Sequence, residues 1–137
     1  MVKKYLLALV AMIPMCANAQ CWVVSNLKGY SAYESEKYKY IENGMSNGIF
    51  QVEINKDSGD VRLVSETLGG GGLEYTPISP SSMVGLYING NTSTIETWAI
   101  TDKNKVLYSK VVNNHQLVTG TTSLIGDVLG DCSGVVK

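Results

Sequence analysis

Short runs rich in Val, Ile, Tyr and Thr recur along the chain, and each run ends at Gly, Asn, Asp or Ser. No segment shows the sustained 3.6-residue period of an amphipathic helix, so the pattern indicates strands joined by turns. Strands at this spacing predict an all-β fold, either a single antiparallel β-sandwich or a small β-barrel. The predicted strands are residues 22–25, 38–42, 48–55, 61–66, 83–88, 94–101, 106–113 and 124–129.

A first hairpin is predicted around a polar turn at residues 55–60. Phe50, Val52 and Ile54 fall on one face of its first strand, because side chains alternate along a strand. Gly59 ends the turn, and glycine can adopt a positive φ there without a steric penalty.

A second hairpin is predicted from residues 95–100 and 106–109, which flank a charged turn. Trp98 and Ile100 fall on the same side of the first strand as Glu96, so polar and apolar positions alternate less cleanly here.

The start of the chain has the three parts of a secretory signal peptide. Two lysines are followed by an apolar run at residues 5–13, and Ala17 and Ala19 occupy positions −3 and −1 of a cleavage site. The apolar run is shorter than the roughly 20 residues of a membrane-spanning helix. We therefore expect residues 1–19 to be removed, leaving one all-β domain at residues 20–137, periplasmic or secreted and without a stable membrane anchor.

The chain has three cysteines, of which Cys16 falls within the signal peptide. A lipid-attachment signal at Cys16 is disfavoured because bulky Met15 precedes it. Cys21 and Cys132 remain, one near each end of the domain, and an even pair in an exported protein predicts a disulfide. Redox-active pairs are usually closer, as Cys-x-x-Cys, so we predict a structural bond.

Residues 67–82 contain four consecutive glycines and two prolines. Both residue types weaken a strand, so this segment is predicted to be a long loop, either functional or only flexible. Leu73 and Glu74 follow the glycines, in place of the Lys and Ser or Thr of a phosphate-binding loop. Residues 27–35 fit a turn, an irregular edge strand or a short helix.

Composition excludes several function classes. The chain has 11 Lys and Arg against 12 Asp and Glu, which is no basic surplus for binding nucleic acid. His115 is the only histidine, and we predict no metal site and no cofactor. No nucleophile motif accompanies His115, and Asp127 with Asp131 lacks the cleft that separates the roles of two catalytic carboxyls. We therefore predict that the protein is not an enzyme.

Tyrosines are the most unusual feature, and four of them fall within residues 30–40 among Glu and Lys. Tyrosine provides rigid amphipathic contact area and is enriched at interfaces. The competing interpretation is that these rings fill the core, because Phe50 is the only phenylalanine. The predicted binding residues are Tyr33, Tyr38, Tyr40 and Tyr75.

These features favour a non-enzymatic module that binds another envelope or secreted protein, for example as an inhibitor or immunity protein. The alternative is a small-ligand carrier whose barrel is closed by residues 67–82, and the least favoured is an envelope hydrolase using His115 or the two aspartates. A carrier requires an apolar cavity, whereas a binding module requires a filled core and exposed tyrosines.

Overall fold

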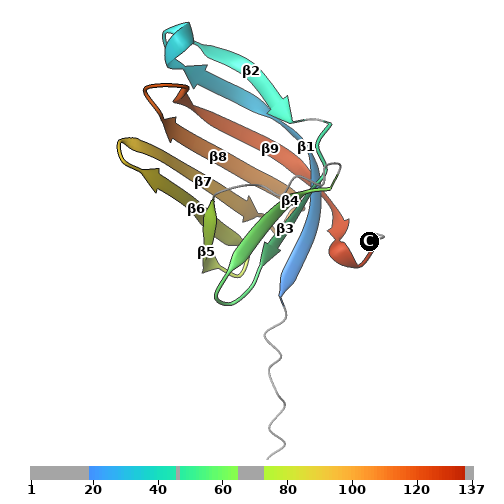
Figure 1. The fold of residues 1–137 in the computed structure, drawn as a ribbon. Helices are drawn as coiled ribbons and strands as arrows, with labels where there is room; N and C mark the ends of the chain where they lie inside the picture. Colours follow the sequence, from blue (N-terminus) through green and yellow to red (C-terminus); the bar gives the residue numbers. More distant parts are fainter. Residues whose placement is uncertain (1–18, 46, 65–72, 135–137) are drawn as a thin grey trace, which may run out of the picture.

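The computed structural model describes residues 19–45, 47–64 and 73–134, and these residues form the all-β fold that the sequence predicts (Figure 1). Most predicted strands are present within a few residues of their expected bounds. In chain order, the elements are β1 (Gln20–Tyr33), the 3-10 turn η1 (Glu34–Glu36), β2 (Tyr40–Met45), β3 (Phe50–Ile54), β4 (Gly59–Leu63), β5 (Glu74–Ser79), β6 (Ser82–Asn89), β7 (Thr92–Ile100), β8 (Lys105–Asn113), β9 (Thr119–Asp131) and η2 (Cys132–Gly134).

The described strands form a closed antiparallel barrel of eight strands with one outer strand, β2. The barrel order is β1-β3-β4-β5-β6-β7-β8-β9, and β9 pairs back onto β1. The sequence predicted either a β-sandwich or a β-barrel. The pairing of the first strand with the last shows that the fold is a barrel.

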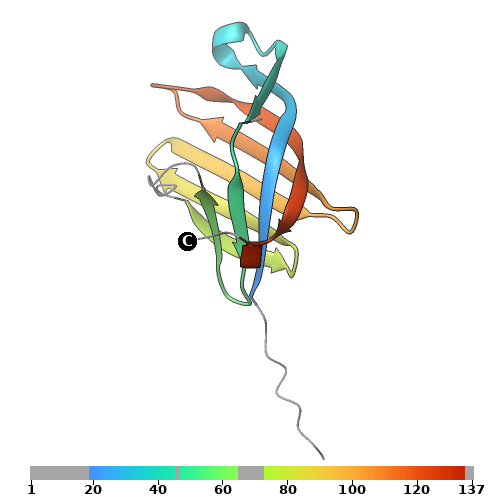
Figure 2. The same ribbon diagram turned by 90° about the vertical axis from the view of Figure 1, so that its right-hand side faces the viewer.

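Strand β1 is long enough to pair with three neighbouring strands. Its first part pairs with β3 and its later part with β2, while its other edge pairs with β9 (Figure 2). Between Ser25 and Lys28 its register with β9 shifts, and Asn26 takes a φ of 57°. Such a bulge bends a strand, which allows one strand to change partners along its length.

Among the described residues, β4 and β5 form the weakest seam of the barrel, with Gly59 and Tyr75 as the only pair in register. A Cβ on Gly59 would overlap Sδ of Met83 and lie 3.2 Å from Cβ of Tyr75. Gly59 sits within β4 and is not among the positive-φ residues. The glycine therefore allows close packing across the seam. It does not adopt the positive φ that the turn pattern allowed.

Inward-facing apolar side chains fill one part of the barrel. Trp98 lies at the centre, with its ring centroid 5.8 Å from that of Phe50 and 4.7 Å from that of Tyr108. Burial of large aromatic and aliphatic side chains is the main favourable term for such a fold. The buried cluster consists of Val24, Leu27, Val52, Ile54, Met83, Trp98, Val106, Tyr108 and Leu124.

The predicted loop at residues 67–82 is wrong in its second half, where β5 forms and β6 begins. Pro77 lies in β5, whose described residues form almost no ladder with β4, and proline is tolerated in strands that have such an unpaired edge. Its glycine-rich first part lies outside the described residues, as does the predicted signal peptide apart from Ala19. Residues 27–33 continue β1 as a strand.

The predicted disulfide between Cys21 and Cys132 is confirmed. The two Cα atoms lie 5.4 Å apart, an ordinary distance for such a bond. The neighbouring residues, Trp22 and Asp131, are register partners of β1 and β9. The bond therefore crosslinks the seam at which the barrel closes.

We expect Cys21→Ser to lower the melting temperature strongly, because the bond closes a loop of almost the whole domain. Chain-entropy arguments give about 4–5 kcal/mol for such a loop, as an upper figure. Circular dichroism of Cys21→Ser, Cys132→Ser and the reduced wild type should give the same lowered melting temperature. An unchanged melting temperature in either variant would contradict the structural role of the bond.

Candidate functional site

A buried carboxylate lies on the inner wall of the barrel. Strand β7 directs Glu96 inward together with Trp98, and only 6% of Glu96 is exposed. Its register partners are Gly85 on β6 and Lys110 on β8. A charged group is costly to bury unless hydrogen bonds or an opposite charge compensate it, so its surroundings decide what it can do.

Three side chains donate hydrogen bonds to the Glu96 carboxylate. Oε1 accepts from Tyr75 Oη at 2.5 Å and from Trp98 Nε1 at 2.7 Å, and Oε2 accepts from Tyr108 Oη at 3.0 Å. Lys110 Nζ lies 3.9 Å from Oε2, which is beyond hydrogen-bond distance. Because a carboxylate has about four acceptor positions, Oε2 keeps capacity for a further donor.

Gly85 makes the Tyr75 contact geometrically possible. A Cβ at this position would lie 2.6 Å from Cε1 of Tyr75, so the tyrosine ring rests directly over the glycine. The ring thereby reaches from β5 across β6 to Glu96 on β7. A larger residue at position 85 would displace the ring from the carboxylate.

The two tyrosine hydroxyls remain protonated donors over a wide pH range. Burial, followed by the hydrogen bond to Glu96, raises the pKa of Tyr75 well above its usual value. Burial, followed by the negative charge of Glu96, raises the pKa of Tyr108 in the same way.

The carboxylate lies at the wall of a cavity of about 310 Å³ between β2–β5 and β7–β8. This volume is near the lower end of the range for small-molecule sites, which are mostly apolar with a few polar groups. Glu96 and Lys110 provide the charged groups. The remaining lining residues are Met45, Phe50, Val61, Leu63, Leu73, Tyr75, Trp98 and Tyr108.

The predicted binding tyrosines divide between the inside and the outside of the barrel. Tyr75 lines the cavity. Tyr33 is partly buried, and its hydroxyl accepts a hydrogen bond from Asn43 Nδ2 at 3.2 Å. The pKa of Tyr33 is lowered, mainly by hydrogen bonding with Ser31. Tyr38 and Tyr40 are 55% and 71% exposed. The structure therefore does not bring the four residues together in one site.

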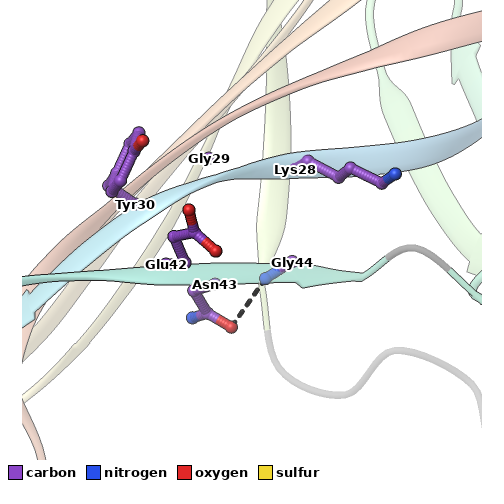
Figure 3. A pocket seen from close by; sticks show the side chains of 6 residues that line it. All are labelled: Lys28, Gly29, Tyr30, Glu42, Asn43 and Gly44. Atoms are coloured by element: carbon purple, nitrogen blue, oxygen red, sulfur yellow. Dashed lines mark hydrogen bonds between the residues drawn. The ribbon is translucent and has the colours of Figure 1, made fainter.

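The outer surface carries shallow hollows around Tyr30. One lies over β1 and β2, and Lys28, Tyr30 and Glu42 are among the residues that line it (Figure 3). Another extends over β9 and includes Tyr40 and Ile125. This face lies on the opposite side of the wall from the Glu96 cavity.

The candidate hydrolase residues occupy separate surroundings. His115 lies in the turn between β8 and β9, whereas Asp127 accepts a hydrogen bond from Lys105 Nζ at 2.5 Å. The pKa of Asp127 is lowered, mainly by the hydrogen bond from Lys105. The pKa of Asp131 is also lowered, mainly by the hydrogen bond from the Ser133 side chain. A general acid requires a raised pKa, so this geometry gives no support to a two-carboxyl mechanism.

The described residues hold neither a metal-binding cluster nor a membrane-spanning helix. Within these ranges no cluster of three His, Cys, Asp or Glu side chains could hold a metal ion. No helix in the same ranges is long and apolar enough to cross a membrane.

Comparisons of the chain with protein-family models, curated proteins and solved structures find no match.

Sequence reasoning missed Glu96, Tyr108 and Lys110 as site residues. The available signal was the position of Glu96 on the same strand face as Trp98 and Ile100, because a carboxylate among inward apolar residues requires buried partners. Those partners lie on β5 and β8 as well as on β7, and the sequence does not show which strands face one another.

We expect Glu96→Leu to destabilise the fold strongly, because it leaves the buried donors of Trp98 and Tyr108 without an acceptor, at about 1–3 kcal/mol each, together with that of the partly buried Tyr75. Glu96→Gln should cost much less, because its oxygen can still accept from Tyr75 and Trp98. Urea denaturation measures both, with Glu74→Leu on the exposed face of β5 as the matched control. A Glu96→Leu variant as stable as wild type would refute the compensating role of these hydrogen bonds.

We expect alkaline pH to destabilise the fold through Tyr75 and Tyr108. Their pKa values are raised in the folded chain above the unfolded value of about 10, so their contribution to stability is present below that pH and is lost as pH rises above it. Melting temperatures measured on both sides of this pH should fall less steeply in Tyr75→Phe/Tyr108→Phe than in wild type. Tyr40→Phe, at an exposed position, is the control that should follow the wild type.

Proposed function

We propose that the protein binds a small, mainly apolar molecule with one polar end group in the cavity beside Glu96. The observation that carries this proposal is a buried carboxylate with unused acceptor capacity at the wall of a cavity lined by aromatic and aliphatic side chains. Sites for small molecules commonly combine such an apolar lining with a few converging polar groups.

The polar end of the ligand is held between Glu96 and Lys110. Oε2 of Glu96 can accept one more hydrogen bond, and the ammonium of Lys110 lies 3.9 Å away, too far to use that position. A hydroxyl group suits this pair because it can donate to the carboxylate and accept from the ammonium.

The body of the ligand lies against the apolar lining. Phe50 and Trp98 offer ring faces or edges, and Val61 with Leu63, the register partner of Phe50, offers aliphatic surface. Apolar area removed from water contributes about 25 cal/mol per Å², so affinity comes mainly from this body and selectivity from the polar end.

We place this binding activity outside the cytoplasm, in the periplasm or the medium. The signal-like residues 1–19 and the Cys21–Cys132 disulfide support that location, because structural disulfides persist in oxidising compartments.

Protein binding is a second candidate function, and the exposure of Tyr38 and Tyr40 favours it. Tyr75 lines the cavity on the inner side of the barrel, so it does not belong to an outer docking surface. The two candidates use opposite sides of the barrel wall and do not exclude one another.

Binding can be tested with 2-naphthol, which has an apolar aromatic body and one hydroxyl, and with naphthalene as the probe that lacks the hydroxyl. In a Trp22→Phe background the fluorescence of Trp98 reports occupancy of the cavity. We expect Glu96→Gln to weaken 2-naphthol binding about tenfold, or about 1.4 kcal/mol, and to leave naphthalene binding unchanged.

A cavity-filling variant keeps the test independent of Glu96. Leu63→Phe should abolish binding of both probes in calorimetry, whereas Leu107→Phe on the outer face of β8 should leave it intact. Failure of the wild type to bind either probe, or normal binding by Leu63→Phe, would refute the proposal.

A further inference from the structure

Strand β2 has an open edge. It pairs with β1 on one side, and among the described residues no strand pairs with its other side (Figure 1). Every residue from 40 to 44 is exposed. An open edge presents a row of backbone N–H and C=O groups that another extended chain can satisfy. The backbone itself therefore specifies the chemistry of a partner at this edge.

The register with β1 shows which backbone groups of β2 point to the open edge. In an antiparallel pair, the groups of alternate residues point toward the partner strand. A Cβ on Gly44 would lie 2.7 Å from the carbonyl oxygen of Leu27, so this carbonyl points toward β2 and bonds its register partner, Met45. Gly44, Glu42 and Tyr40 are the alternate residues, and their N–H and C=O groups point to the open edge.

One donor at the open edge is already occupied. The N–H of Gly44 donates to Oδ1 of Asn43 at 2.8 Å, which is the dashed line in Figure 3. Nδ2 of the same Asn43 side chain donates to Oγ of Ser31 at 2.8 Å, which fixes its position. Within the described chain, the N–H groups of Tyr40 and Glu42 remain for a binding partner.

Strand β5 also has a largely unpaired edge among the described residues, but it carries Pro77. Proline lacks the N–H that an added strand requires, and proteins use proline and lysine to protect strand edges. Strand β2 contains neither of these residues. Strand addition is therefore obstructed at β5 and unobstructed at β2.

We propose that the open edge of β2 binds an extended segment of another protein as an added strand. In this mode, main-chain hydrogen bonds provide affinity and side-chain contacts provide selectivity. Tyr40 and Glu42 flank the edge on the outer face, and Ile41 flanks it on the inner face. Apolar and opposite-charge pairs across neighbouring strands are stabilising. The segment therefore carries apolar residues opposite Tyr40 and Ile41, and Lys or Arg opposite Glu42.

Charge complementarity favours another protein over a second copy of β2. Glu42 is the only charged residue of this strand, so a copy of β2 cannot supply the basic residue. The proposal gives the protein-binding candidate a defined binding mode. It does not rest on the cavity, because the edge consists of backbone groups of β2 and the cavity is tested through Glu96 and Leu63.

The peptide acetyl-Val-Thr-Thr-Lys-Val-Ile-amide tests strand addition. Aligned antiparallel to β2, it places its lysine opposite Glu42 and its last two residues opposite Ile41 and Tyr40. In heteronuclear NMR titrations, the amide signals of Tyr40 and Glu42 should shift strongly, because the new hydrogen bonds form there. The amide of Ile41, which points to β1, should shift less.

Two N-methylated forms of the peptide are matched controls. N-methylation of the lysine and the isoleucine removes the two N–H groups that face β2, and should weaken binding at least about tenfold. N-methylation of the third and fifth residues removes N–H groups that face away from β2, and should leave the affinity unchanged. Equal effects of the two forms would contradict strand addition.

Glu42→Pro tests the same contact from the side of the protein. It removes an N–H from the open edge and no hydrogen bond to β1, so the fold should be retained. Glu42→Gln, which removes the charge and keeps the N–H, is the matched variant. Glu42→Pro should bind the peptide at least about tenfold more weakly than Glu42→Gln.

Three results would overturn the proposal. The first is an absence of amide shifts in β2 at millimolar peptide. The second is equal peptide affinity of folded Glu42→Pro and Glu42→Gln. The third is a set of β2 amide signals that move with protein concentration alone and ignore the peptide, because this indicates pairing of two copies.

Discussion

The antiparallel pairing of β1 with β9 is the contact on which the rest of the structure depends. It joins the first strand to the last, and the Cys21–Cys132 disulfide crosslinks the same seam. Without this pairing the sheet would be open, and its inner face would be exposed to water. Closure is possible because the bulge at Asn26 bends β1, so that one strand can pair with β3, β2 and β9.

Closure of the barrel also determines which side chains face one another in its interior. It sets β3 against β7, so that Phe50 packs on Trp98. Tyr75 reaches Glu96 along the wall itself, across the neighbouring strand β6. A buried polar network is stable only when nearly all its members are satisfied, because an unpaired group is costly in a low-dielectric interior. Three neutral donors stabilise the Glu96 carboxylate. On the side of the cavity, Oε2 can accept a further hydrogen bond and Lys110 can donate one.

The wall of the barrel separates two chemical environments. Its inner side combines an apolar cavity with one carboxylate and one ammonium, which suits a small molecule with a polar end. Its outer side carries exposed apolar side chains over β6–β9, and Lys28, Tyr30 and Glu42 at the β1–β2 edge.

The sequence by itself determined the strand class, most strand positions and the disulfide. Side-chain alternation and turn residues act over a few neighbouring residues, and the predicted domain contains two cysteines, so each has one possible partner within it. Only the tertiary structure shows that the fold is a barrel and that Pro77 lies within β5. It also places Tyr75 on the inner side of the barrel and Tyr40 on the outer side. Glu96 could be seen on an inward strand face, but its role depends on Tyr75 and Tyr108, each on a different strand. Local patterning fixes which way a side chain points along its own strand, whereas long-range pairing decides which side chains it meets.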